Sequence, residues 1–132
     1  MENVTRIEQK KENTVYEDIM SFLDEVELKS ENTRVAYETD IRQFFQFMLN
    51  KKIEDLTLED LKFRHAEIVR YKVYLAEKYS ATTVNRKIAS LRSLFVFLEK
   101  NYPERIKSAV FKVDKMREVN VRHSGTLTWE EV

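Results

Sequence analysis

Residues 80–102 read SATTVNRKIASLRSLFVFLEKNY, and this stretch decides the fold. Its apolar residues recur at spacings of 4, 3, 4 and 3, the period of an amphipathic helix with one buried stripe. Ser80 begins this helix as a cap and Pro103 ends it. The stripe that we expect to face a core consists of Val84, Ile88, Leu91, Phe95 and Leu98.

The opposite face of this helix is small, polar and cationic, and no acidic residue precedes Glu99. Hydroxyl groups between arginines allow a polyanion to approach and accept hydrogen bonds. The face therefore predicts contacts with phosphates and base edges. A solvated surface helix that happens to lack acids is the alternative. The residues on the face or along its edges are Thr82, Thr83, Asn85, Arg86, Lys87, Ala89, Ser90, Arg92 and Ser93.

Composition predicts one all-α domain. The 132 residues are enough for a single core, and they include one glycine and one proline, so the usual turn residues of a β-sheet are missing. There is no cysteine, and the two histidines lie far apart, so we expect neither a metal site nor a cofactor. No apolar run is long enough to span a membrane and no signal-peptide core is present, which predicts a cytoplasmic protein.

The net charge is zero, but the charges separate along the chain. Residues 1–29 contain 4 basic and 8 acidic residues, whereas residues 79–115 contain 8 basic and 3 acidic residues. The basic segment includes the helix described above. A nucleic-acid partner would therefore meet a local patch rather than a basic protein.

The pattern predicts four main helices around one core. Residues 1–13 are polar and aperiodic, and we expect a flexible tail there. Thr14 with Glu17, Ser30, and Thr57 with Asp60 are start signals for the elements that follow. The expected helices are 15–28, 31–50, 58–79, which is one helix or two joined near His65, and 80–102.

Two further surfaces suggest partners. Asn32, Thr33 and Arg34 open the second helix, where free amides and the helix dipole favour an anion, so we expect a phosphate contact. The first helix is acidic on its exposed side, which suits a protein contact better than DNA, and a solvated acidic face is the bland alternative.

Beyond Pro103 the periodicity decays. Residues 104–125 read as a basic linker with one short helical turn near 105–111, and Thr128 to Glu131 form another start signal just before Val132. We assign residues 14–111 to the domain and 112–132 to a linker with the first residues of an absent domain. The chain then reads as a fragment of a longer protein.

The order of these motifs resembles the N-terminal core-binding domain of tyrosine recombinases, meaning phage-type integrases and Xer-like recombinases. The resemblance covers roughly residues 15–132. The motifs are Ser30 to Thr33, then Tyr37, Asp40 and Phe44, then Leu56 to Asp60, Tyr74 with Leu75, Ser80 to Lys87, Leu91 to Phe95, and Leu127 to Val132.

The resemblance implies a SAM-like four-helix bundle that binds double-stranded DNA as one half of a clamp, with two helices in the major groove. It also implies that the first helix contacts a neighbouring recombinase protomer. The active-site tyrosine of the family lies in the catalytic domain, so we expect no catalysis from this chain. By position, the implied DNA contacts are Asn32, Thr33, Arg34, Ser80, Thr82, Thr83, Asn85, Arg86, Lys87 and Ser90.

Some features depart from the family pattern. The usual Asn-Pro and Pro-Lys elements between the two domains are replaced by Asn101-Tyr102-Pro103 and Val113-Asp114-Lys115. Two other functions fit the residues. One is a helical protein-interaction module, which would show no salt-dependent DNA affinity. The other is a truncated integrase that competes with the full enzyme for recombination sites.

Overall fold

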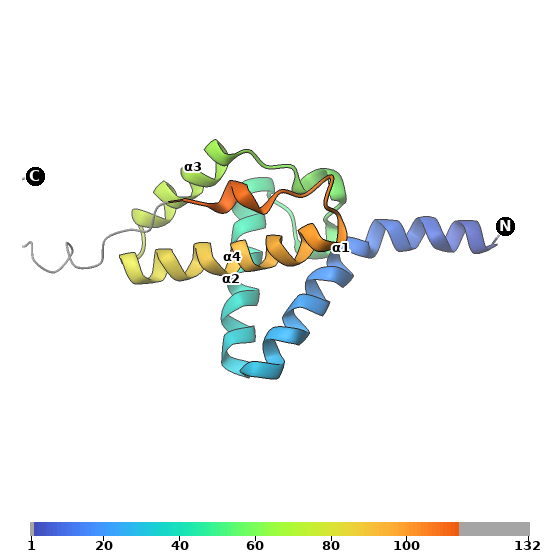
Figure 1. Ribbon diagram of the computed structural model, residues 1–132, viewed down its shortest axis with the longest axis horizontal. Helices are drawn as coiled ribbons and strands as arrows, with labels where there is room; N and C mark the ends of the chain where they lie inside the picture. Colours follow the sequence, from blue (N-terminus) through green and yellow to red (C-terminus); the bar gives the residue numbers. More distant parts are fainter. Residues whose placement is uncertain (1, 114–132) are drawn as a thin grey trace, which may run out of the picture.

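The computed structural model describes residues 2–113 of the chain, and within this range the fold is all-α (Figure 1). The predicted capping box at Thr128 lies outside the described residues. The helices are α1 (Glu2–Lys29), α2 (Glu31–Leu49), η1 (Ile53–Asp55), η2 (Leu58–Leu61), α3 (His65–Ala76), α4 (Ala81–Asn101) and η3 (Ser108–Phe111).

The helix starts follow the caps that the sequence contains. Ser30 Oγ accepts the amide of Thr33 at 3.2 Å, and Ser80 Oγ accepts the amide of Thr83 at 3.3 Å. Asn50 ends α2 in the left-handed region, with φ of 55°, a conformation that asparagine tolerates better than most residues. The region 58–79 consists of two elements, η2 and α3, which was one of the two expected arrangements.

The first helix begins far earlier than predicted. It starts at Glu2, so the predicted start near residue 15 is wrong, whereas the flexibility expected for residues 1–13 stays a prediction. These residues contain no glycine or proline and are mostly good helix formers, so the helix extends without an apolar stripe. Figure 1 shows the first turns of α1 extending away from the other helices.

The core is built on aromatic rings around Phe44 of α2. Its ring centroid lies 5.0 Å from that of Tyr71 on α3 and 5.7 Å from that of Phe111 in η3. The expected stripe of α4 is buried along its whole length, and Leu94 is buried with it. Edge-to-face contacts of this kind add to the burial of the rings, so α2 is the central element of the bundle.

The segment after α4 is part of the core. Ile106 and Phe111 are fully buried, and Glu99 of α4 accepts hydrogen bonds from both the amide (3.2 Å) and the hydroxyl (2.6 Å) of Ser108. The short helical turn predicted near 105–111 is confirmed as η3. The prediction that the whole stretch from 104 is a linker is wrong for residues up to Phe111. Residues 104–111 form a strap against the bundle. Two widely spaced apolar residues are enough to hold it there, although its apolar residues follow no helical period.

We expect Phe111→Ala to lower the free energy of unfolding by about 3–5 kcal/mol, since it removes a buried ring and leaves a cavity. Urea unfolding followed by circular dichroism measures the change. Lys112→Ala is the matched control on an exposed neighbour. A loss below about 0.5 kcal/mol for Phe111→Ala, the range of ordinary surface substitutions, would contradict the packing of this strap.

Candidate nucleic-acid interface

The two helices expected to bind DNA cross each other, and a buried carboxylate lies at the crossing (Figure 1). Asp40 of α2 is 1% exposed and faces α4. Its Oδ2 accepts a hydrogen bond from Arg86 at 2.5 Å and its Oδ1 accepts one from Lys87 at 3.0 Å. Ser90 Oγ lies 3.1 Å from Asp40 Oδ2 and 2.8 Å from the carbonyl of Lys87, and its single proton can serve either acceptor. One carboxylate thus meets three polar side chains of α4.

Lys87 extends this network to a second polar residue of α2. The ammonium group donates to Gln43 Oε1 at 2.8 Å and lies 4.9 Å from the ring centroid of Tyr79. Gln43 Nε2 in turn donates to the Tyr79 hydroxyl at 3.0 Å. Burial and the nearby charge of Asp40 raise the pKa of the Tyr71 hydroxyl. The crossing therefore contains a group of polar contacts inside an otherwise apolar bundle.

Two residues predicted to face outward are buried instead. Lys87 is 5% exposed and Ser90 is fully buried, so their placement on the outer face and its edge is wrong. A helical wheel places each residue by its angle alone and does not show which groups lie opposite. Both Lys87 and Ser90 lie on the side of α4 that faces Asp40. Because Asp40 supplies an acceptor, burying these polar groups leaves none of them unpaired.

Arg34 is engaged by the acidic first helix. Its guanidinium lies 2.7 Å from Asp24 and 2.6 Å from Glu27, both on α1. These hydrogen bonds raise the pKa of Arg34 above its ordinary value. Arg34 and Asp40 are separated by about 120° around α2 at 100° per residue. The structure therefore pairs Arg34 with α1 and Arg86 with α2, and the prediction that both contact one groove stays a prediction.

The remaining predicted contacts lie near the starts of α2 and α4. Asn32, Ser80 and Thr82 are exposed, whereas Thr33 and Asn85 are half-buried. Thr83 is half-buried too, and its hydroxyl accepts a hydrogen bond from Ser80 Oγ at 3.2 Å. Arg86 keeps 44% of its side chain exposed while contacting Asp40. The accessible polar groups of the first turns of α4 are thus two hydroxyls and one guanidinium.

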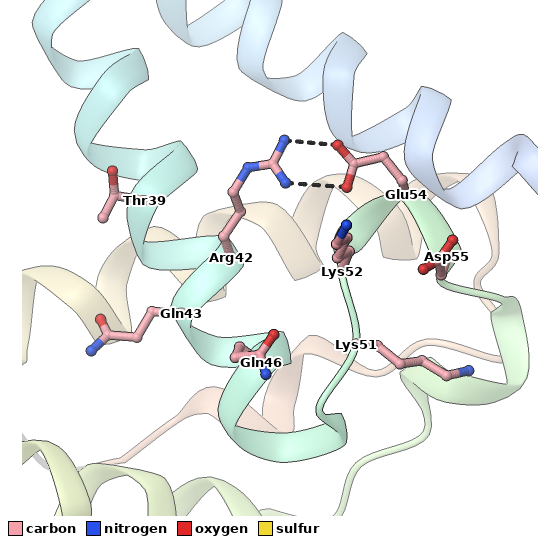
Figure 2. A pocket seen from close by; sticks show the side chains of 8 residues that line it. All are labelled: Thr39, Arg42, Gln43, Gln46, Lys51, Lys52, Glu54 and Asp55. Carbon is pink, nitrogen blue, oxygen red and sulfur yellow. Dashed lines mark hydrogen bonds and ion pairs between the residues drawn. The ribbon is translucent and has the colours of Figure 1, made fainter.

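A stripe of α2 that the prediction left out adjoins this surface. Thr39, Gln43 and Gln46 recur at helical spacing on its outer side and line an open hollow of about 900 Å³ (Figure 2). Lys51, Lys52, Glu54 and Asp55 form the other wall of the hollow. The sequence did contain a signal for this surface. The acid at position 40 lies beside the aromatic stripe of α2, where a carboxylate requires a polar partner on a facing helix. The position of that partner locates the crossing of the two helices.

The charges in this hollow compensate one another. Arg42 forms a two-point contact with Glu54, at 3.1 Å and 3.0 Å, which Figure 2 shows as paired dashed lines. Arg42 also donates to Glu38 at 3.1 Å. The hydrogen bonds from Arg42 hold the pKa of Glu54 below its ordinary value. The uncharged groups of the stripe are hydrogen-bonded within the protein as well: Gln43 contacts Tyr79 and Lys87, Gln46 donates to Asn50, and the hydroxyl of Thr39 donates to the carbonyl of Val35.

Comparison with known proteins identifies the family. Residues 16–101 match the family described as phage integrase, N-terminal SAM-like domain, so the chain belongs to this family. Its fold and its place as the core-binding domain of tyrosine recombinases follow, which implies DNA binding in site-specific recombination. Both the predicted family and the predicted fold class are confirmed.

Several relatives carry recombinase names. The chain is 33% identical over 143 residues to the SPbeta prophage-derived probable integrase/recombinase YopP of Bacillus subtilis (strain 168), covering 95% of this chain and 40% of the relative. It is 43% identical over 70 residues to tyrosine recombinase XerC of Listeria monocytogenes serotype 4a (strain HCC23), covering 52% of this chain and 22% of the relative. The chain thus spans less than half of these relatives. No solved structure gives a significant match.

Two features are absent from the part of the chain that the structure describes. None of the helices between Glu2 and Phe111 is long and apolar enough to cross a membrane. Among residues 15–113, whose side chains the structure describes, no group of three or more histidine, cysteine, aspartate or glutamate residues is arranged to hold a metal ion.

We expect Glu54→Gln to reduce stability more at neutral pH than in acid. A carboxyl whose pKa is lowered on folding stabilises the protein above its unfolded pKa of about 4.3, and this contribution is lost as the pH falls through the folded value. Urea unfolding of both proteins at pH 7 and near pH 3 measures the difference, with Glu77→Gln as an exposed control. An equal difference at both pH values would contradict a charged Arg42–Glu54 contact.

Proposed function

We propose that this chain binds duplex DNA as the core-site-binding part of a site-specific recombinase, and that the surface over the α2–α4 crossing enters the major groove. It acts by positioning a DNA site, and it carries no catalytic residue of its own. The whole protein's reaction, integration or another strand exchange, belongs to this proposal through the recombinase relatives.

The observation that carries the proposal is the half-exposed guanidinium of Arg86 at the crossing of two helices. The major groove is wide enough for one α-helix, and side chains from a second helix that crosses it can reach the flanking phosphates. Thr82 and Ser80 at the start of α4 are exposed, and Gln43 of α2 lies beside Lys87, the residue next to Arg86. Such a surface permits close approach of a nucleic-acid backbone.

The side chains divide into contacts and supports. Arg86 neutralises a phosphate or donates to guanine, Thr82 and Ser80 set the register, and Gln46 offers the amide geometry that pairs with adenine. Asn32 is available at the start of α2. Thr33, Thr83 and Asn85 are half-buried and can add contacts only at the edge of the surface. We leave out Lys87, Ser90 and Arg34 as direct contacts, because carboxylates or burial already engage them.

The chain by itself should bind weakly. A single domain that contacts one face of the duplex should have a Kd in the non-specific range of about 10⁻⁴ to 10⁻⁶ M at physiological salt.

We expect Arg86→Gln to weaken duplex binding about tenfold and to reduce the slope of log K against log salt by about 0.9, because one phosphate contact is lost. Glutamine leaves Asp40 paired with Lys87, so the fold should survive. Fluorescence anisotropy with a labelled duplex over a series of salt concentrations measures both quantities.

Two arginines provide matched controls. Arg34→Gln and Arg105→Gln remove the same charge from residues paired with acids away from the crossing, at Glu27 and Glu59 respectively. Both should change the affinity less than twofold, well below the tenfold loss of a full charge-assisted contact. Equal losses for all three variants would show that only net charge matters and would remove the groove assignment.

A contact between protomers on DNA is the second candidate, and α1 favours it. Leu28 is 88% exposed at the end of α1, beside the exposed carboxylates of Glu25 and Glu27. We expect Leu28→Asp to leave binding to a duplex with one site unchanged and to reduce cooperative binding to a duplex with two sites. Equal cooperativity in both proteins, measured by gel shift, would exclude this face.

A further inference from the structure

Asp40 is a buried charge that the DNA contact itself does not use. It is 1% exposed, it comes from the middle of α2, and its three polar neighbours all belong to α4. A buried ion pair contributes little net stability compared with apolar residues that fill the same space, so packing alone gives no reason for a carboxylate at this position. Its particular effect must be sought in the groups that it holds.

The group that matters is Arg86. Long side chains on a surface lose much conformational freedom when they are fixed, and an arginine that is held before DNA arrives has already lost part of it. Asp40 holds one end of the Arg86 guanidinium, and the side chain remains 44% exposed. The contact therefore orders the side chain and still leaves donors for another acceptor, because a guanidinium has five N–H groups.

Asp40 also sets the charge of the crossing. Arg86 and Lys87 bring two positive charges and Asp40 brings one negative charge, so the crossing carries one net positive charge. Lys87 is additionally held by Gln43 and the Tyr79 ring, which leaves it buried as the second support of the carboxylate.

We propose that Asp40 is a positioning residue of the DNA interface: it fixes Arg86 at the α2–α4 crossing and removes half of the local positive charge, so that binding there depends on geometry more than on charge. This inference rests on the proposed DNA-binding function. Lys87 and Ser90 act through Asp40 and make no contact with DNA.

The test is the double variant Asp40→Asn/Lys87→Met in the full chain. It removes one charge of each sign, so net charge is unchanged and no buried lysine is left without a partner. We expect the order parameter of Arg86 Nε, measured by ¹⁵N relaxation without DNA, to fall below about 0.6, the range of flexible groups. A structural role alone would not change the mobility of this one side chain while helix content stays the same.

The same variant tests the effect on DNA. With a random-sequence duplex about two helical turns long, we expect the affinity to fall about two- to tenfold, because Arg86 must now lose its freedom when it binds. The slope of log K against log salt should stay the same, because the crossing keeps one net positive charge. The matched control is Glu59→Gln/Lys62→Met. Glu59 lies in η2, Lys62 follows η2, and their exposed side chains form an ion pair at 3.1 Å. This variant should change neither the order parameter of Arg86 nor the binding of DNA.

Lys87→Met alone separates the carboxylate from the lysine. This variant keeps Asp40 beside Arg86, so Arg86 should stay ordered. An Arg86 side chain that stays ordered in the double variant, or an affinity for the duplex that stays the same, overturns the proposal. A wild-type chain that binds no duplex instead overturns the proposed function, and the mobility of Arg86 still decides whether Asp40 positions it.

Discussion

One interaction decides how α2 and α4 meet: the buried carboxylate of Asp40 contacts three polar side chains of α4. Apolar packing alone allows neighbouring helices to slide and rotate, because many arrangements bury similar areas. A buried charge is different, since it is costly unless its partners lie at specific positions. Asp40 therefore selects one register for α2 against α4, and the aromatic core around Phe44 fills the space that this register leaves.

The same contact separates the cations by role. Lys87 is paired inside the bundle. Arg34 is paired with the acids of α1, and Arg42 is paired with Glu54 and Glu38. Arg86 is the cation at the crossing that stays half-exposed. Under the proposed function, Arg86 is the positive group that this domain directs at DNA, and a broad basic surface, which would bind any polyanion, is not needed. The acidity of α1 serves this arrangement by holding Arg34 away from the crossing.

The segment after α4 extends the domain beyond its last long helix. Ile106 and Phe111 are buried in the core and Glu99 holds the start of η3. Whatever follows residue 113 is therefore connected to a strap that packs directly on α4. A force on this strap would reach the helix that carries Arg86 through Phe95, whose ring lies 4.5 Å from that of Phe111.

The sequence by itself determined α2 and α4, their caps at Ser30 and Ser80, their apolar stripes and the family, because each of these depends on local spacing and short-range chemistry. Only the tertiary structure decided which polar residues face outward. Lys87 and Ser90 face inward because they contact Asp40 across the crossing, although Asp40 lies 47 and 50 residues away from them in the sequence. Arg34 is paired with acids of another helix. Long-range pairing of charges leaves no periodic signal in one sequence, so the composition of the surface could not be predicted from a helical wheel.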